Sequence, residues 1–172
     1  MSPFDLPWPR ETERAVVRLL MMDDVEAMLS YRSMPEVCRY LNHDVLDRAA
    51  VEDRIRSRLP EGQAADAGAT CGLAVEVDGQ MVGDAMLRTI PADSQVWIGF
   101  GFHPRVWGRG LATEVATELV HAVSALNLTV MADAFVDNHA SQKVLVRAGL
   151  VKQGTVGDPG SERAVFVMPA RT

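Results

Sequence analysis

A short segment at positions 102–113 combines residue types that could bind an anion. Two glycines one residue apart, Gly108 and Gly110, stand directly before a long segment with helical apolar spacing. Backbone N–H groups are unpaired at a helix start and the helix dipole is positive there, so this position attracts anions. Glycine lets the backbone approach a bulky ligand closely, and Arg105 and Arg109 add positive charge. We therefore predict an anion site here, with a plain strand-to-helix turn as the alternative.

A second polar segment, Asn138 to Ser141, lies at the start of another expected helix. The side-chain oxygen of Asn138 can accept a hydrogen bond from one of the unpaired N–H groups there, so we predict an N-cap. Ser141 follows one turn later, and its residue type alone indicates a small polar side chain near a helix start. Neither segment comes with H-x-x-x-H or C-x-x-C spacing, so we predict no metal site.

The spacing of apolar residues predicts the elements that must position these segments. Alternating or short continuous apolar runs indicate strands, and apolar spacings of three and four indicate helices. We expect strands at 12–20, 70–77, 80–88, 95–102, 128–136 and 161–168, and helices from 23 onward, at 47–59, at 111–126 and at 138–148. The small, polar stretch 60–69 is expected to be a loop.

Local signals refine the first half of this pattern. Asp23, with Glu26 three residues later, predicts a capping box at the start of the first helix. Pro35 either ends that helix or restarts it. Asp78-Gly79 between two apolar runs predicts a two-residue type I′ hairpin turn, because both positions need positive φ.

The expected helix at 47–59 carries a strongly charged face. Its apolar residues recur at a spacing of four, and the opposite face holds Arg48, Asp53, Arg54, Arg56 and Arg58. The simplest interpretation of such a face is a solvated surface.

The whole chain has the composition of a soluble globular protein, with 172 residues, 48% hydrophobic and 23% charged. We expect a single domain over 1–172 with a proline-rich leader at 1–11. The net charge of -6 argues against a nucleic-acid binder, which usually needs a basic excess. No apolar run approaches the roughly 18 residues of a membrane span, and the N-terminus lacks the pattern of a signal peptide. We therefore expect a cytoplasmic protein with no membrane partner, and two free cysteines.

The anion segment carries a resemblance to a known family. Arg105-x-x-Gly108-x-Gly110 followed by Leu111-Ala112-Thr113-Glu114 resembles the acetyl-CoA pyrophosphate motif of the GNAT acetyltransferase superfamily, and the likeness extends from Thr12 to Met168. Further segments resemble its ribosomal-protein N-terminal acetyltransferase (RimJ/RimL-like) branch: Glu13-Arg14-x-x-x-Arg18, Met22-Asp23-Asp24, Ile98-Gly99-Phe100, His103-Pro104, and Asn138-His139-Ala140-Ser141 with Val144-Leu145 and Gly149-Leu150. The resemblance implies an α/β fold with a mixed sheet, the GNAT acyl-CoA N-acyltransferase fold, in the order β-α-α-β-β-β-α-β-α-β and with a splayed central sheet.

The same resemblance implies a site. Acetyl-CoA would be the cosubstrate, without a metal, and its pantetheine arm would lie where two parallel strands splay apart. Backbone N–H groups near Phe100 to Phe102 would polarise the acetyl carbonyl, with a bulge at Gly99 and Gly101. The implied cofactor-binding residues are Phe100, Gly101, Phe102, Arg105, Gly108, Arg109, Gly110, Leu111, Ala112, Thr113 and Asn138. The implied catalytic residues are Ser141, which would hydrogen-bond or protonate the CoA sulfur, Asn138 and His103.

The sequence departs from the family pattern at two positions. Many relatives have a tyrosine as general acid where this chain has Leu145, and many have a glutamate where it has Trp97. His103, Asp84 and Asp133 are the candidates for a general base, with a water relay or an amine that arrives neutral as alternatives. His103 has a further interpretation as a structural residue at a strand end.

The expected reaction is transfer of an acetyl group from acetyl-CoA to a primary amine, with a protein N-terminal α-amine as one candidate. The alternatives are acetylation of a small-molecule amine, such as an antibiotic, a polyamine or an amino acid, and a non-catalytic acyl-CoA-binding sensor. Acceptor recognition is expected on the two early helices and their connection, where the following residues cluster in sequence: Tyr31, Arg32, Glu36, Arg39, Tyr40 and His43. The protein is expected to be a monomer or a homodimer.

Overall fold

The computed structural model describes residues 3–62, 68–90 and 94–168. The helices are α1 (Val25–Arg32), α2 (Pro35–Cys38), α3 (Arg48–Arg56), α4 (Leu111–Ser124) and α5 (His139–Arg147), with short 3-10 turns at Pro3–Asp5, Met22–Asp24, Pro60–Gly62 and Pro104–Val106. The strands are β1 (Arg10–Glu11), β2 (Val16–Leu19), β3 (Thr70–Val77), β4 (Gln80–Ile90), β5 (Gln95–Phe102), β6 (Thr129–Phe135), β7 (Val151–Val156) and β8 (Arg163–Met168). No helix in these ranges combines the length and apolar composition that a membrane crossing requires.

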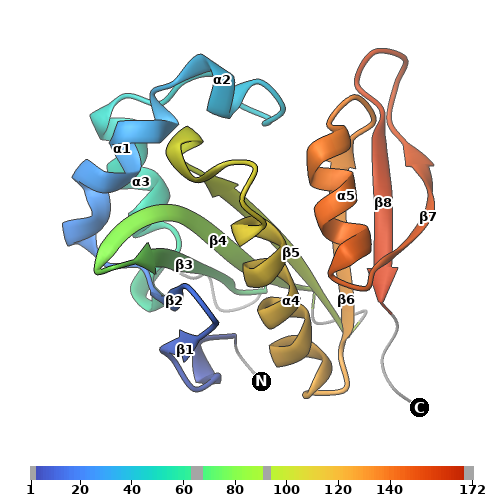
Figure 1. Cartoon of the computed structure of the whole chain (residues 1–172), viewed down its shortest axis with the longest axis horizontal. Coiled ribbons are helices and arrows are strands. Elements are labelled where there is room, and N and C mark those ends of the chain that lie inside the picture. Colours follow the sequence, from blue (N-terminus) through green and yellow to red (C-terminus); the bar gives the residue numbers. More distant parts are fainter. Residues whose placement is uncertain (1–2, 63–67, 91–93, 169–172) are drawn as a thin grey trace.

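One mixed sheet runs through the molecule in the order β1-β2-β3-β4-β5-β6-β8-β7 (Figure 1). Neighbouring strands are antiparallel except for β5 and β6, which are parallel. The β3–β4 turn has positive φ at both Asp78 and Gly79, as the type I′ prediction requires. The predicted α/β fold with a mixed sheet is confirmed.

The parallel pair β5–β6 is where the sheet splays. β6 pairs with β5 at only three positions, from Gln95 to Trp97. β4, in contrast, pairs with every residue of β5, from Gln95 to Phe102. Residues 98–102 therefore have a partner strand on one side only, and the two strands diverge beyond Trp97 (Figure 1). The predicted splayed central sheet follows from this early end of the pairing.

The predicted bulge in β5 is wrong. The register between β4 and β5 is unbroken from Gly83↔Phe102 to Ile90↔Gln95, so no extra residue is inserted at the glycines. Glycine in a strand also marks a close approach of another group, and that is its role here. A Cβ on Gly99 would lie 3.1 Å from Met86, and one on Gly101 would lie 2.6 Å from the Arg32 guanidinium.

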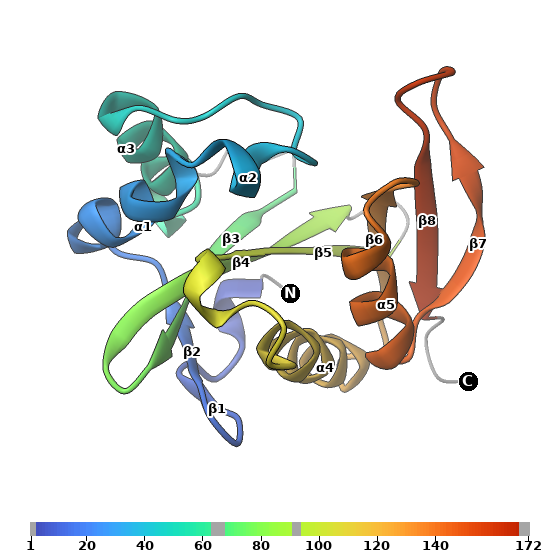
Figure 2. The same cartoon turned by 45° about the horizontal axis from the view of Figure 1, so that its top comes forward.

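Helices cover both faces of the sheet (Figure 2). On one face α1 and α3 pack over β3 and β4, where the buried side chains include Met28, Ile55 and Ala74. On the other face α4 and α5 cover a larger core that includes Leu119 and Leu145. Helices from the first half of the chain therefore cover one face of the sheet, and helices from the second half cover the other. The gap between β5 and β6 lies between these two layers of helices.

Three elements of the structure are additional to the predicted order. β7 is an edge strand with all six residues exposed, so it has no apolar alternation from which to predict it. β1 is only two residues long, and it follows a segment, 3–9, in which Leu6 packs into the core. α2 begins at Pro35, so the proline starts a new helix and does not only end α1. This helix has four residues. Within the expected loop 60–69, residues 63–67 lie outside the described residues.

The cap of the first helix is one residue later than predicted. Asp24 is the N-cap residue of α1 by position, but its side chain accepts no hydrogen bond from the first turn of that helix. It accepts one from the Met21 N–H at 3.0 Å instead, which caps the preceding 3-10 turn, so the predicted Asp23–Glu26 capping box is not formed. Asp24 is buried and forms a bidentate ion pair with Arg18, at 2.7 and 2.8 Å, whereas Asp23 is exposed. The Asp24 carboxylate is therefore directed to Arg18 of β2, a contact that the local sequence pattern does not contain.

Candidate acetyl-CoA and acceptor site

The glycine segment forms an exposed turn that opens directly into α4. Gly108 and Gly110 have φ of +72° and +78°, a region that glycine adopts without the strain of a side chain. Gly110 is the N-cap of α4, and no side chain caps the first turn. The N–H groups of Leu111 to Thr113 have no partner within the helix, so they remain available for an anion.

A residue from the N-terminal segment holds this turn in place. The Arg14 guanidinium donates to the Arg109 carbonyl at 2.7 Å and to Glu114, in the first turn of α4, at 2.8 Å. Arg14 thus holds the Arg109 carbonyl in place and adds positive charge next to Gly110, at the start of α4. The sequence marked Arg14 only through the family resemblance, and its link to the turn is a tertiary contact.

Glu114 gives a test of this arrangement through pH. Partial burial favours its neutral form, but hydrogen bonds from Thr12 and Arg14 outweigh that effect and hold the pKa of Glu114 below its usual value. A folded-state pKa below the unfolded value of about 4.3 stabilises the fold above that pH, and the contribution is lost as the pH falls through the folded pKa. We expect Glu114→Gln to lower the free energy of unfolding by about 1–2 kcal/mol at pH 7 and by clearly less at pH 3.

Urea unfolding at both pH values measures this difference. Glu26→Gln is the matched control, because Glu26 pairs with Arg48 on the open surface and such pairs contribute little. An equal loss of stability in Glu114→Gln at pH 7 and pH 3 would show that the ion pair does not carry the effect.

The edge of β5 beyond Trp97 presents free backbone groups to the gap. The His103 N–H donates to the Val82 carbonyl of the neighbouring chain segment at 2.8 Å. N–H groups alternate in direction along a strand, so those of Phe100 and Phe102 point away from β4 and toward the gap. The Phe102 carbonyl also faces away from β4, where it accepts from Trp107 Nε1 at 2.9 Å.

The start of α5 has the predicted N-cap. Asn138 Oδ1 accepts from the Ser141 N–H at 3.2 Å, and Asn138 Nδ2 donates to Ser141 Oγ at 3.0 Å. Because Ser141 Oγ accepts this bond, its own hydrogen is left to donate to a ligand. Gln142 was not predicted as a site residue; its side-chain amide donates to the carbonyls of Phe135 and Val136 and ties α5 to the end of β6.

The candidates for a general base differ in how they are paired. Asp84 is buried and accepts from Tyr31 and from the Arg32 guanidinium, and nearby arginines lower its pKa against the effect of burial. Asp133 forms a bidentate ion pair with Arg163 at 2.6 and 2.9 Å. Arginine thus holds the pKa of Asp84 below its usual value, and both oxygens of Asp133 already accept hydrogen bonds from Arg163, so neither carboxylate is without a cationic partner.

His103 lies at the end of β5 and also forms a cap. Its Nδ1 accepts from the Arg105 N–H at 3.1 Å, so the proton of the neutral ring lies on Nε2. Burial, and then the charge of Arg105, lower its pKa. Nδ1 is the nitrogen that would take up a proton, and to do so it would have to give up the hydrogen bond from the Arg105 N–H. The loss of that bond makes His103 a weaker base.

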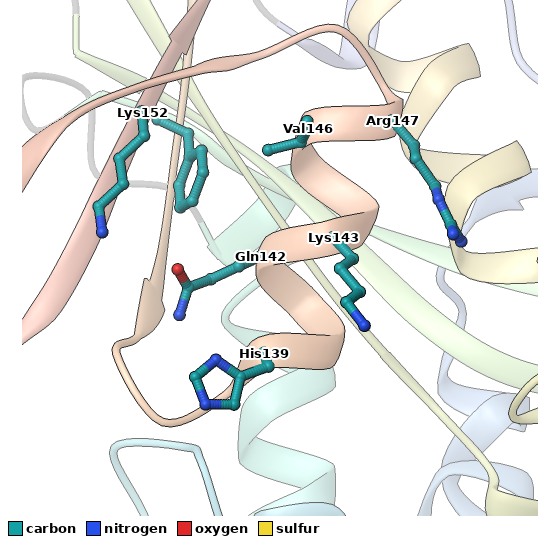
Figure 3. A pocket seen from close by; sticks show the side chains of 7 residues that line it. His139, Gln142, Lys143, Val146, Arg147 and Lys152 are labelled. Carbon is teal, nitrogen blue, oxygen red and sulfur yellow. The ribbon is translucent and has the colours of Figure 1, made fainter.

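Other predicted residues lie apart from this arrangement. The Arg105 side chain is exposed and reaches Gln80 Oε1 at 3.5 Å. Leu145 is 1% exposed in the core, so the position of the family's tyrosine faces the interior. A cavity of about 370 Å³ lies beside α5, β7 and β8, with His139, Gln142 and Lys152 on one side of the helix (Figure 3). That cavity contains no predicted site residue.

Metal chemistry has no visible support in the part of the chain that the structure describes. No group of three or more His, Cys, Asp or Glu side chains is placed to bind an ion there. Cys38 and Cys71 are both free and buried, as predicted.

The geometry defines a class: a splayed sheet with free strand-edge N–H groups, next to a helix start that is open to an anion. Comparison with known proteins identifies it further. Residues 14–151 match the acetyltransferase (GNAT) domain family. The chain belongs to this family, and it is an acetyl-CoA-dependent N-acetyltransferase.

Three similar proteins show the range within the family. An uncharacterised N-acetyltransferase, YoaA of Bacillus subtilis (strain 168), is 27% identical over 152 residues, which cover 85% of this chain and 84% of YoaA. The structure of AAC(6')-Ib with paromomycin and acetyl-CoA has a TM-score of 0.76 at 17% identity, covering 91% of this chain and 94% of the other. RimL, a ribosomal L7/L12 α-N-protein acetyltransferase in complex with coenzyme A, has a TM-score of 0.78 at 13% identity, with 92% and 96% covered. These two structures show a shared fold.

Proposed function

We propose that this N-acetyltransferase acts on an α-amino group, such as a protein N-terminus, as the RimJ/RimL-like branch does. The observation that supports this choice is the pairing of the acids: Asp84 and Asp133 are both bound by arginine. With no carboxylate of these two free to remove a proton, the acceptor has to reach the thioester largely unprotonated. An α-amine meets this condition far better than a lysine side chain, because its pKa is about 8 rather than 10.4.

The cofactor residues have separate tasks in this proposal. The N–H groups from Gly108 to Thr113 bind the pyrophosphate, with Arg105 and Arg109 as neighbouring charges. The strand edge from Phe100 to Phe102 binds the pantetheine arm and polarises the acetyl carbonyl. Asn138 orients Ser141 beside the CoA sulfur. The support for this assignment is the free N–H groups at α4 and β5 and the free hydroxyl hydrogen of Ser141.

The reaction is a direct transfer. The lone pair of the neutral amine attacks the thioester carbon, a nitrogen–carbon bond forms, and the carbon–sulfur bond breaks. The leaving thiolate accepts a hydrogen bond from Ser141 and takes up a proton that Ser141 relays from solvent, and the amine loses one proton to water or to His103, from which it returns to solvent. Atoms and charge balance with the amide and free CoA as products.

The preference for α-amines is a measurable prediction. At pH 7 an amine with a pKa of 8 is neutral roughly 200 times more often than one of 10.4. We expect kcat/KM for a peptide with a free α-amine and an acetylated lysine to exceed that for its N-blocked, free-lysine counterpart by about 100-fold. A thiol-release assay at pH 7 measures both, and amino acids and an aminoglycoside complete the panel.

One result would contradict this proposal, and the pH dependence of His103→Ala identifies the proton acceptor. Comparable rates for the N-blocked lysine peptide at neutral pH would refute the argument from the paired acids. If His103 accepts the proton, His103→Ala should abolish an acidic limb in the pH–rate profile that lies below the ordinary histidine pKa of about 6.5. If water accepts it, the profile of His103→Ala should match that of the wild type.

A further inference from the structure

Three arginines surround the buried carboxylate of Asp84. Arg32 comes from α1 and donates to Asp84 Oδ1 at 2.7 Å. Arg54 and Arg58, from α3 and the turn after it, lie 3.8 and 3.9 Å from Asp84 Oδ2. The charged face predicted to be solvated is therefore turned inward at two of its positions, and that interpretation of Arg54 and Arg58 was wrong.

The hydrogen bonds within this cluster are unevenly distributed. Asp84 Oδ1 accepts from the Tyr31 hydroxyl and from two nitrogens of Arg32. Arg54 and Arg58 lie too far from Oδ2 to donate a hydrogen bond. Arg54 Nε and one Arg32 terminal nitrogen, Nη1, are buried without a hydrogen-bond partner. Such unpaired buried donors are rare and costly.

The charges are unbalanced as well. Three guanidinium groups face one carboxylate, which leaves an excess of two positive charges in a place where buried charges are normally paired. Burial, followed by repulsion from Arg54, lowers the pKa of Arg58 to about 10. His43 contributes no negative charge: its Nδ1 bonds to the Asp44 carbonyl, and its Nε2 is buried without a partner.

The cluster lies against the strand that carries the proposed acetyl site. Arg32 is in contact with the backbone at Gly101 of β5, where a Cβ would meet its guanidinium at 2.6 Å. Arg54 and Arg58 retain 19% and 15% exposure, so solvent reaches them, whereas Arg32 is 2% exposed. The excess charge thus lies on the face of the sheet that α1 and α3 cover, and through Arg32 it reaches β5.

We propose that Arg54 and Arg58, supported by Arg32, bind an anionic group, a carboxylate or a phosphate, carried by the amine that is acetylated. The proposal rests on the proposed function, because it names a feature of the acceptor in that reaction. An anion at this position would supply the missing negative charge and accept hydrogen bonds from Arg54 and Arg58, which lie too far from Asp84 Oδ2 to donate to it. Arginine is suited to this task because its planar fork matches carboxylate and phosphate oxygens.

A purely structural ion-pair network is the competing explanation, and α3 itself provides the comparison. Arg48 and Arg56 lie on the same helix, are 53% and 60% exposed, and each pairs with an acid, Glu26 and Asp53. A structural network would be expected to have similar one-to-one pairing. Removing Arg54 should relieve repulsion within the cluster while Arg32 continues to neutralise Asp84, so Arg54→Gln should not lower the urea midpoint.

The first experiment measures binding without turnover. With coenzyme A at saturation to occupy the cofactor's own phosphate sites, inorganic phosphate and malonate are added separately and the melting temperature is recorded. We expect at least one of them to raise it in the wild type and in the control Arg56→Gln, and neither to do so in Arg54→Gln/Arg58→Gln. An equal shift in the double variant would overturn the proposal.

The second experiment measures selectivity. Tripeptides with a free α-amine are compared in pairs that differ only by Asn or Asp, or by Ser or phosphoserine, at position two or three. We expect the anionic member of at least one pair to have a KM at least about 10-fold lower, and Arg54→Gln or Arg58→Gln to remove most of that difference with the KM for acetyl-CoA unchanged. Arg54→Lys, which keeps the charge and loses the fork, should be intermediate.

The outcomes separate this proposal from the proposed function. Turnover of α-amines with no preference for an anionic member in any pair would overturn the anion site and leave the α-amine function standing. Absence of turnover with every amine would overturn the proposed function, and the melting experiment would then still decide whether Arg54 and Arg58 bind an anion.

Discussion

Replacing Gly110 by aspartate is expected to weaken acetyl-CoA binding by about 100-fold or more, with the fold retained. A carboxylate at this position lies beside the N–H groups that would bind the pyrophosphate, and two like charges about 4 Å apart near a surface repel by several kcal/mol. The substitution also imposes a side chain on a φ of +78°. Nothing closer than Arg14, at 3.6 Å, would contact the new Cβ, so a steric clash is not the cause.

A matched control separates charge from backbone strain. Gly79→Asp introduces the same residue at a nearly equal φ of +74° and into open space, but in the β3–β4 hairpin. We expect it to have similar stability to Gly110→Asp and normal acetyl-CoA affinity by calorimetry. Gly110→Asn, which keeps the strain without the charge, should lose much less affinity than Gly110→Asp. Unchanged affinity in Gly110→Asp would remove the phosphate assignment from the start of α4.

The elements that the sequence predicts well are those whose own residues carry a strong period. The stripe from Leu111 through Val115 to Leu119 places one face of α4 in the core. Turn chemistry is similarly local, which is why Asp78-Gly79 and the Asn138 cap are both found in the structure. In each case the signal and the structure that it forms lie within a few residues of each other.

The errors in prediction come from contacts between distant residues. Arg54 and Arg58 are predicted from the sequence to lie on a solvated face because they are charged, although their spacing of three and seven residues from Val51 places them on the same side of the helix as Val51. Asp84, on a strand that begins more than twenty residues later, attracts them inward instead. A lone aspartate in an apolar strand is a signal that a cationic partner is needed, but the sequence does not say which arginine supplies it.

The same reasoning applies to the glycines of β5. Glycine is favoured both at a bulge and where another group approaches the strand closely, so residue type alone does not distinguish the two. The unbroken register with β4 and the position of Arg32 over Gly101 decide for close approach. Because Gly101 has no Cβ, the Arg32 side chain can approach β5, the strand that is proposed to hold the acetyl group.

If both proposals hold, the two halves of the chain contribute different parts of the reaction. The starts of α4 and α5 present the groups proposed to bind the cofactor, and both have polar or glycine N-caps, Gly110 and Asn138. The face covered by α1 and α3 presents the charged cluster at Asp84. The gap beyond Trp97 is where the two would meet, which makes the splay of β5 and β6 the structural condition for transfer.

Ser141→Ala is expected to lower kcat by about 100-fold, the lower end of the range for acid–base catalysis, with little change in acetyl-CoA affinity. The structure explains why the effect should be confined to turnover. Asn138 Oδ1 still caps α5 through the residue 141 N–H, which alanine retains, and alanine favours the helix. Only the hydroxyl hydrogen is lost, and that is the hydrogen proposed to reach the CoA sulfur.

Two further variants make this prediction specific. Ser124→Ala removes a hydroxyl at the far end of α4, where it contacts Met168, and should leave kcat unchanged. Ser141→Thr retains the hydroxyl and should recover a substantial part of the lost rate. If Ser141 assists departure of the thiolate, replacing acetyl-CoA by an acetyl thioester with a more acidic thiol should shrink the deficit of Ser141→Ala, because a better leaving group needs less help. An equal deficit with both thioesters, or wild-type turnover in Ser141→Ala, would confine Ser141 to its hydrogen bond with Asn138.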